Sequence, residues 1–86
     1  MKRLLAKAHE IGFNTQVERE SRSFHVQTEV YGEAELIVRT MVIEEGRVHH
    51  VQKRSYPPDE DLVQFQEQVD VQHQLCVSRV QRGDLG

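Results

Sequence analysis

The strongest constraint on the fold is the alternation of apolar and polar residues that runs, with interruptions, from residue 13 to residue 56. It is clearest in the second segment, where Phe24, Val26, Thr28 and Val30 alternate with His25, Gln27 and Glu29. Successive side chains of a strand point to opposite faces of a sheet, so this period of two predicts strands with one apolar and one polar face. A polar turn at residues 18–23 separates this segment from the first one, and together the segments predict a four-stranded antiparallel meander.

Residues 35–43 differ from the other segments because both of their faces are apolar. Leu36, Val38 and Val42 share one face, and Ile37, Met41 and Ile43 share the other. Such a strand is typical of the centre of a sheet that is covered on both sides. We expect the C-terminal helix to cover one side, and the N-terminal helix or a second protomer to cover the other.

The pairing of the second and third strands is predicted from the phase of their apolar residues. Pairing Val26 with Thr40 keeps both apolar sets on one face and places Arg39 opposite Gln27. Several registers fit the third and fourth strands, and that pairing is left open.

Two helices are predicted to flank the sheet. Apolar residues at helical spacing precede Gly12 and predict a short N-terminal helix within residues 1–12. After Pro57-Pro58, acidic residues 59–61 provide an N-cap and favourable charge for a long helix over residues 59–82. An apolar stripe runs along this helix, with His73 at its edge. A chain of 86 residues supports one core, so we predict a single α+β domain spanning residues 1–86 with its sheet at residues 13–56.

The charge balance limits the classes of partner. The formal net charge of -3 disfavours a general nucleic-acid binder, which needs excess Lys and Arg to neutralise phosphates. One cysteine cannot form an internal disulfide, the N-terminal residues do not resemble a secretory leader, and no apolar run has the length of a membrane span. We therefore expect a cytoplasmic protein with neither nucleic-acid nor membrane partners.

His25, Gln27 and Glu29 form the most suggestive polar group. They project from one side of a strand at intervals of about 6.6 Å, and Arg39 on the neighbouring strand would complete the row. Such a row can bind an extended peptide, a carboxylate or a polar ligand, or it can be a solvated face with weak cross-strand ion pairs. No activated nucleophile or carboxylate pair accompanies the histidine, so we predict no catalytic site and no enzyme.

Val71 and Leu75 lie four residues apart on the helix face opposite the apolar stripe. Single exposed aliphatic residues are ordinary. Combined with the doubly apolar third strand, however, this pair favours a homodimer or a bound protein partner.

Three further groups have simpler interpretations than a functional site. His49 and His50 are strand neighbours that should point to opposite faces and so not bind one metal ion. Cys76 lies within the apolar stripe near His73 and reads as a buried thiol rather than a ligand. Neither a metal nor a cofactor is therefore predicted. The basic residues of the fourth strand, Arg47, Lys53 and Arg54, either meet an acidic partner or are neutralised by nearby acids such as Glu44 and Glu45.

Several motifs resemble a family of small bacterial proteins, many from deltaproteobacteria, that carry a Y/F-H-V-Q-T-E strand. The residues that carry the resemblance are Asn14-Thr15-x-Val17, Phe24-His25-Val26-Gln27-Thr28-Glu29, Gly46-Arg47-Val48, Ser55-Tyr56 and the helix end from Gln74 to Gly83. Family members usually follow T-E with an acidic, Gly-containing turn, and Val30-Tyr31-Gly32 departs from that pattern. The family has no established activity, so the resemblance implies a bacterial, cytoplasmic origin and little about chemistry.

The predicted function is that of a small non-enzymatic protein-interaction module. It would act as an adaptor or regulatory subunit, for example in a polarity, motility or signalling assembly, and bind another protein or itself. His25, Gln27, Glu29 and Arg39 would supply polar specificity, and Val71 and Leu75 apolar contact. The alternative is a sensor domain that binds a small ligand or nucleotide over the polar face of the second strand.

Overall fold

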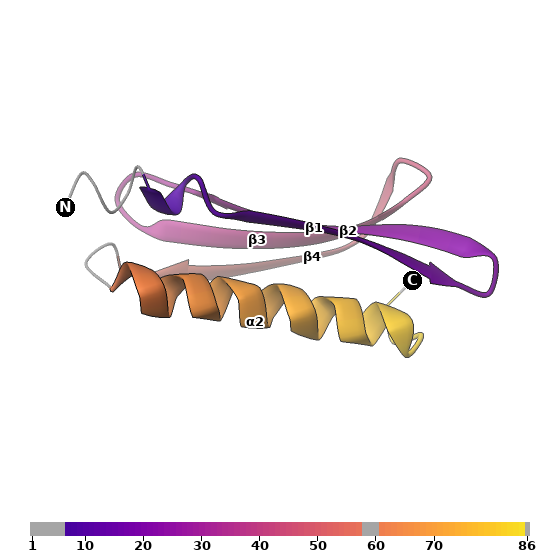
Figure 1. Ribbon diagram of the computed structural model, residues 1–86. Coiled ribbons are helices and arrows are strands. Elements are labelled where there is room, and N and C mark those ends of the chain that lie inside the picture. The colour runs from indigo at the N-terminus through magenta and orange to yellow at the C-terminus, as the bar shows by residue number, and fades with distance from the viewer. Residues whose placement is uncertain (1–6, 58–60, 86) are drawn as a thin grey trace.

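The protein folds into one twisted antiparallel sheet with a long helix against one face (Figure 1). The computed structural model describes residues 7–57 and 61–85. Its elements are β1 (Gly12–Arg19), β2 (Arg22–Tyr31), β3 (Leu36–Glu44), β4 (Arg47–Tyr56) and α2 (Leu62–Gln81). The strands pair in sequence order, β1-β2-β3-β4, and every pairing is antiparallel. The predicted α+β class, the four-stranded meander and the C-terminal helix are confirmed.

The predicted register of β2 and β3 is wrong by two residues. Val26 pairs with Val42 rather than Thr40, and Arg39 lies opposite Glu29 rather than Gln27. A shift of two residues leaves every side chain on the same face, so the hydrophobic pattern could not distinguish the two registers. The observed register joins Arg39 to Glu29 in an ion pair and Thr28 to Thr40 in a hydrogen bond of 2.7 Å.

The turn between β1 and β2 is shorter than predicted. The strands continue to Arg19 and from Arg22, so only Glu20 and Ser21 connect them. Both residues have positive φ, 53° and 67°. This is the backbone of a two-residue type I′ turn, which fits the twist of a hairpin but disfavours residues other than Gly, Asn and Asp.

Replacing Glu20-Ser21 with Asn-Gly is therefore expected to stabilise the domain by about 1 kcal/mol, because these residues adopt positive φ with less strain. Urea denaturation of the double variant measures the change. The same replacement at the exposed pair Gln81-Arg82, whose C-terminal residue has right-handed helical backbone, is the control and should not stabilise. An unchanged or lower stability for the turn variant would contradict the assignment.

The long helix begins at Leu62, three residues after the start predicted at residue 59. Asp61 is the N-cap, and its carboxylate accepts hydrogen bonds from the backbone N–H groups of Val63 (2.8 Å) and Gln64 (3.3 Å). The helix ends at Gln81, one residue short of the predicted end. Most of the predicted N-terminal helix lies outside the described residues, and in the described part only Lys7 and Ala8 have helical backbone before β1 starts at Gly12.

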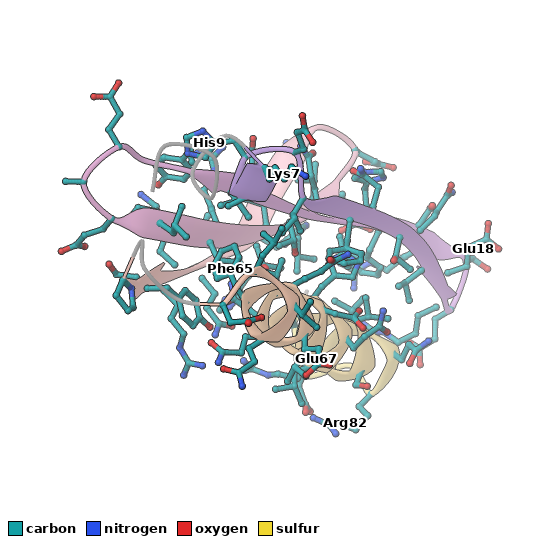
Figure 2. All side chains as sticks on the ribbon, turned by 60° about the vertical axis from the view of Figure 1, so that its left-hand side comes forward. Lys7, His9, Glu18, Phe65, Glu67 and Arg82 are labelled. Carbon is teal, nitrogen blue, oxygen red and sulfur yellow. The ribbon has the colours of Figure 1, made fainter. Side chains whose placement is uncertain are left out.

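The core lies between α2 and the sheet, and a polar layer divides it into two apolar clusters. Phe24 lies in one cluster with the C-terminal half of α2, and Phe65 lies in the other with its N-terminal half. Figure 2 shows Phe65 pointing from the helix toward the sheet, whereas Glu67 points away. Between the clusters lie the buried polar residues Thr28, Thr40, Gln72 and His73.

Within the described residues, only one of the two apolar faces of β3 is covered. Leu36, Val38 and Val42 are buried under α2, but Ile37, Met41 and Ile43 remain partly exposed. The described end of the N-terminal segment does not cover that second face. Ala8 is fully buried in the Phe65 cluster, on the same side of the sheet as α2.

Candidate interaction surfaces

The predicted polar row lies on the face of the sheet that points away from α2, which we call the open face. His25, Gln27 and Glu29 alternate along β2 with the buried residues of that strand. Cross-strand neighbours already bind two of them. His25 Nε2 donates a hydrogen bond to Asn14 Oδ1 at 2.9 Å, and Glu29 accepts one from Arg39.

Arg39 is held in place by its neighbours on the open face. Its guanidinium donates to Glu29 and lies 5.3 Å from the ring centroid of Tyr31. The hydrogen bond to Glu29 raises the pKa of Arg39 above its ordinary value. His25, Gln27, Glu29 and Arg39 therefore form one continuous row, as predicted, although Arg39 lies at the Glu29 end of it.

An apolar cluster occupies the other half of the open face. Met41 pairs directly with Val51, and Ile43 pairs with Val48. Val48 and Val51 are 53% and 45% exposed, and Met41 and Ile43 are partly exposed. The sequence pattern identified the β3 residues as apolar, but the contribution of β4 was missed because its pairing with β3 was left open.

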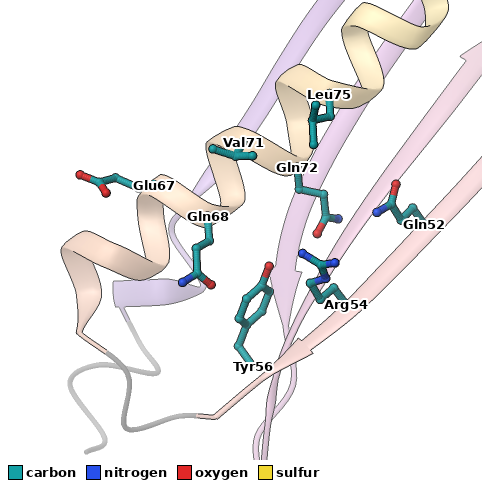
Figure 3. A pocket seen from close by; sticks show the side chains of 8 residues that line it. All are labelled: Gln52, Arg54, Tyr56, Glu67, Gln68, Val71, Gln72 and Leu75. Carbon is teal, nitrogen blue, oxygen red and sulfur yellow. The ribbon is translucent and has the colours of Figure 1, made fainter.

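Val71 and Leu75 lie on the opposite side of the molecule from the polar row. Both are exposed, 56% and 62%, as expected from their place on the helix. They form one wall of a groove between α2 and β4, because α2 packs mainly over β1, β2 and β3 (Figure 3). The six predicted partner-binding residues are thus divided between two surfaces, which the sheet separates.

The groove between α2 and β4 has a volume of about 310 Å³. Gln52, Arg54 and Tyr56 line it from β4, and Glu67, Gln68, Val71, Gln72 and Leu75 line it from α2. Tyr56 and Gln72 are only 8% and 4% exposed, yet within the described part of the chain Tyr56 Oη and Gln72 Oε1 have no hydrogen-bond partner. A buried polar atom without a partner costs about 1–3 kcal/mol, which makes these two atoms candidates for contact with a ligand.

The acids near the β3–β4 turn do not neutralise β4 as a whole. Glu44 accepts two hydrogen bonds from Arg22, at 2.6 Å and 2.8 Å, and lies 2.9 Å from His49 Nε2. The bond from Arg22, with a smaller contribution from His49, lowers the pKa of the Glu44 carboxyl to about 2. Among the described residues, Arg47, Lys53 and Arg54 form no ion pair, so the basic part of β4 remains available to an acidic partner.

The prediction that His49 and His50 point to opposite faces is wrong, because a β-bulge interrupts β4. Val42 pairs with His50 and Ile43 with Val48, which leaves His49 as the extra residue. The rings of His49 and Phe24 pack edge to face, with 6.1 Å between their centroids. His50 lies opposite the buried Val42. Both histidines therefore lie on the α2 side. In residues 7–57 and 61–85, no three His, Cys, Asp or Glu side chains are placed to hold a metal ion.

His73 is a core residue and does not reach either surface. Its Nε2 lies 2.8 Å from Thr15 Oγ1, its Nδ1 lies 2.7 Å from Thr28 Oγ1, and its ring packs against Phe13. Burial lowers the pKa of His73, against an opposing effect of Asp70, and burial raises the pKa of the nearby Cys76 thiol. The apolar stripe placed His73 at the edge of the helix face, and the threonines that bind it could not be identified without the strand pairing.

Comparison with known protein families, curated proteins and solved structures finds no match to this chain. The resemblance to small bacterial proteins with a Y/F-H-V-Q-T-E strand stays a prediction. Of the helices in the described residues, none has the length and apolar character required to cross a membrane.

Proposed function

We propose that this chain is a non-enzymatic protein-interaction module of the bacterial cytoplasm, an adaptor or regulatory subunit, that forms a homodimer through the open face of its sheet. The observation that carries the proposal is the exposed apolar cluster of Met41, Ile43, Val48 and Val51 on a face that no described element covers. Apolar residues grouped in this way on a small domain are typical of a protein interface.

The size and charge of the open face are compatible with a second copy as its partner. A face of four strands of about nine residues has an area of roughly 600 Å², so two such faces would bury about 1,200 Å², the lower end of the range for stable interfaces. Its strands carry two acids, Glu18 and Glu29, and two bases, Arg39 and Lys53. Like charge therefore does not oppose self-association.

The arrangement of the face also resembles the usual anatomy of an interface. The apolar cluster would form the centre, and His25, Gln27, Glu29 and Arg39 would form a polar rim that sets orientation and specificity. The competing function, a sensor that binds a small ligand over the polar face of β2, has less support. Two groups of that row, His25 and Glu29, are already bound to Asn14 and Arg39.

The absence of enzymatic activity is likewise part of the proposal. The buried histidine, His73, has both ring nitrogens within hydrogen-bond distance of threonine hydroxyls inside the core, so it cannot reach a substrate. Within residues 7–57 and 61–85, the side chain that binds the His25 ring is the amide of Asn14, and an amide does not activate a histidine as a carboxylate does.

Val51→Glu is expected to convert the dimer into a monomer, because it places a charge at the centre of the buried face. Sedimentation velocity at protein concentrations up to about 200 µM measures the mass of each form. The matched control is Val63→Glu, which introduces the same charge at an exposed valine on α2 and should leave the dimer intact. A monomeric wild type, or a Val51→Glu variant that remains dimeric, would show that the open face is not a homodimer interface.

A further inference from the structure

We infer that the groove between α2 and β4, together with the outer edge of β4, binds an extended acidic segment of a partner protein as a fifth strand. The groove lies on the other side of the sheet from the open face, although the edge of β4, with Lys53, borders both surfaces. The inference does not rest on the proposed homodimer.

The first support is the exposed edge of β4. This strand is the last in the sheet, and among residues 7–57 and 61–85 no strand pairs with its outer edge. An unpaired edge presents backbone N–H and C=O groups that an extended peptide can bind. The bulge at His49 disrupts one end, but from His50 to Tyr56 the pairing with β3 is regular and β4 contains no proline. A peptide can therefore pair along this regular part.

The second support is the groove beside that same part of the strand. Gln52, Arg54 and Tyr56 alternate along β4 and face the groove, and Val71 and Leu75 form its apolar wall on α2 (Figure 3). An added strand would direct every second side chain to the α2 side of the sheet. Aliphatic side chains of the peptide would then enter the groove and cover Val71 and Leu75.

The third support is the pair of buried polar atoms without partners in the groove. Gln72 Oε1 can only accept a hydrogen bond, and Tyr56 Oη can donate or accept one. Both residues are more than nine-tenths buried and line the groove. A ligand in the groove can supply the partner that each of these atoms lacks.

The charged residues beside the groove indicate which side chains the bound segment should carry. Lys53 and Arg54 are exposed on opposite faces of β4 and form no ion pair among the described residues. In an alternating segment the acidic side chains would lie on the Lys53 side of the strand, and the positive charge of both bases would speed the encounter with an acidic segment. Glu67 lies on the α2 wall of the groove, so the side chains that enter beneath α2 should be neutral.

The probe is a fluorescein-labelled, end-capped heptapeptide, Glu-Leu-Glu-Val-Glu-Leu-Glu, whose aliphatic residues share one face of a strand. Fluorescence anisotropy is expected to show saturable binding, weakened about tenfold or more by Leu75→Glu and by Arg54→Glu. Val63→Glu is the matched control on α2 and should bind the probe as wild type does. Leu75→Glu should leave the mass of the protein unchanged, which distinguishes this surface from the proposed dimer interface.

Two control probes test the strand-like mode of binding. One has the same composition with all four glutamates first, and the other has proline in place of the central valine, which removes a backbone donor. Both should bind at least about tenfold more weakly. Amide NMR shifts should change along residues 50–56 and α2, not along β1, which is the other edge of the sheet.

No binding of the alternating probe, equal binding of the reordered or proline probe, or shifts confined to β1 or the open face would overturn the inference. Binding that Leu75→Glu does not weaken would overturn it as well. Each variant must first show a cooperative urea transition, so that loss of binding is not loss of the fold.

Discussion

Replacing His73 by alanine is expected to lower the free energy of unfolding by about 3 kcal/mol. The imidazole is fully buried at the centre of the polar layer, so its removal leaves a cavity. It also removes a partner from the hydroxyls of Thr15 and Thr28. A domain of this size has a total stability of about 4–13 kcal/mol, so the variant should lose about a quarter to three quarters of it.

Urea denaturation at pH 7.5 measures this loss. The matched control is Gln74→Ala, the neighbouring exposed residue of α2, which should change the stability by less than about 0.5 kcal/mol. If His73→Ala were as stable as the control, the polar layer would not hold the two halves of the core together.

Lowering the pH from 7.5 to 5.0 is expected to destabilise the fold, with a slope of up to about 1.4 kcal/mol per pH unit below pH 6.5. Burial lowers the pKa of His73 in the folded protein. As the pH falls through the ordinary histidine range, the unfolded chain binds a proton that the folded chain does not. The stabilising contribution of neutral, buried His73 is therefore complete above about pH 6.5. It is lost on acidification until the pH reaches the lowered pKa of folded His73.

The groups around His73 define the pH window of this experiment. Asp70 raises the pKa of His73 by less than burial lowers it, and His25 adds to the lowering. The pKa of Glu44 is lowered to about 2, so its stabilising effect is present above the usual carboxyl range and is lost only as the pH falls toward 2. Between pH 7.5 and 5.0, the Glu44 contribution is nearly constant and the His73 effect can be measured separately.

Urea denaturation across this pH range should show that the free energy of unfolding changes less steeply with pH in His73→Gln than in wild type. Glutamine retains polar atoms near the threonines but cannot bind a proton. His25→Gln, which removes an exposed histidine from the open face, is the control and should retain most of the wild-type slope. Equal slopes for His73→Gln and wild type would show that another group causes the pH dependence.

Features that depend on residues close in sequence were predicted well. The alternation in β2 correctly identified the buried face of Phe24, Val26, Thr28 and Val30. The acidic start of the last helix identified the cap region, because a cap is built from residues within one turn of each other. The exposure of Val71 and Leu75 also followed from helical spacing alone.

Features that depend on pairing between distant segments were predicted poorly. Two registers of β2 and β3 have the same hydrophobic pattern, so the position of Arg39 opposite Glu29 required the structure. The bulge at His49 turns two neighbouring histidines to one side, which a strict period of two cannot show. The buried polar atoms of Tyr56 and Gln72 that lack partners lie between α2 and β4, and this placement of the helix required the structure.

The amino-acid sequence by itself determined the type and order of the main secondary-structure elements and the face that β2 buries, because these follow from local periodicity, turn residues and caps. Only the tertiary structure decided which surfaces remain uncovered. One helix can cover only one face of a sheet, so α2 leaves the open face uncovered. A four-stranded sheet is also wider than one helix, so α2 covers β1 to β3 and leaves the groove beside β4.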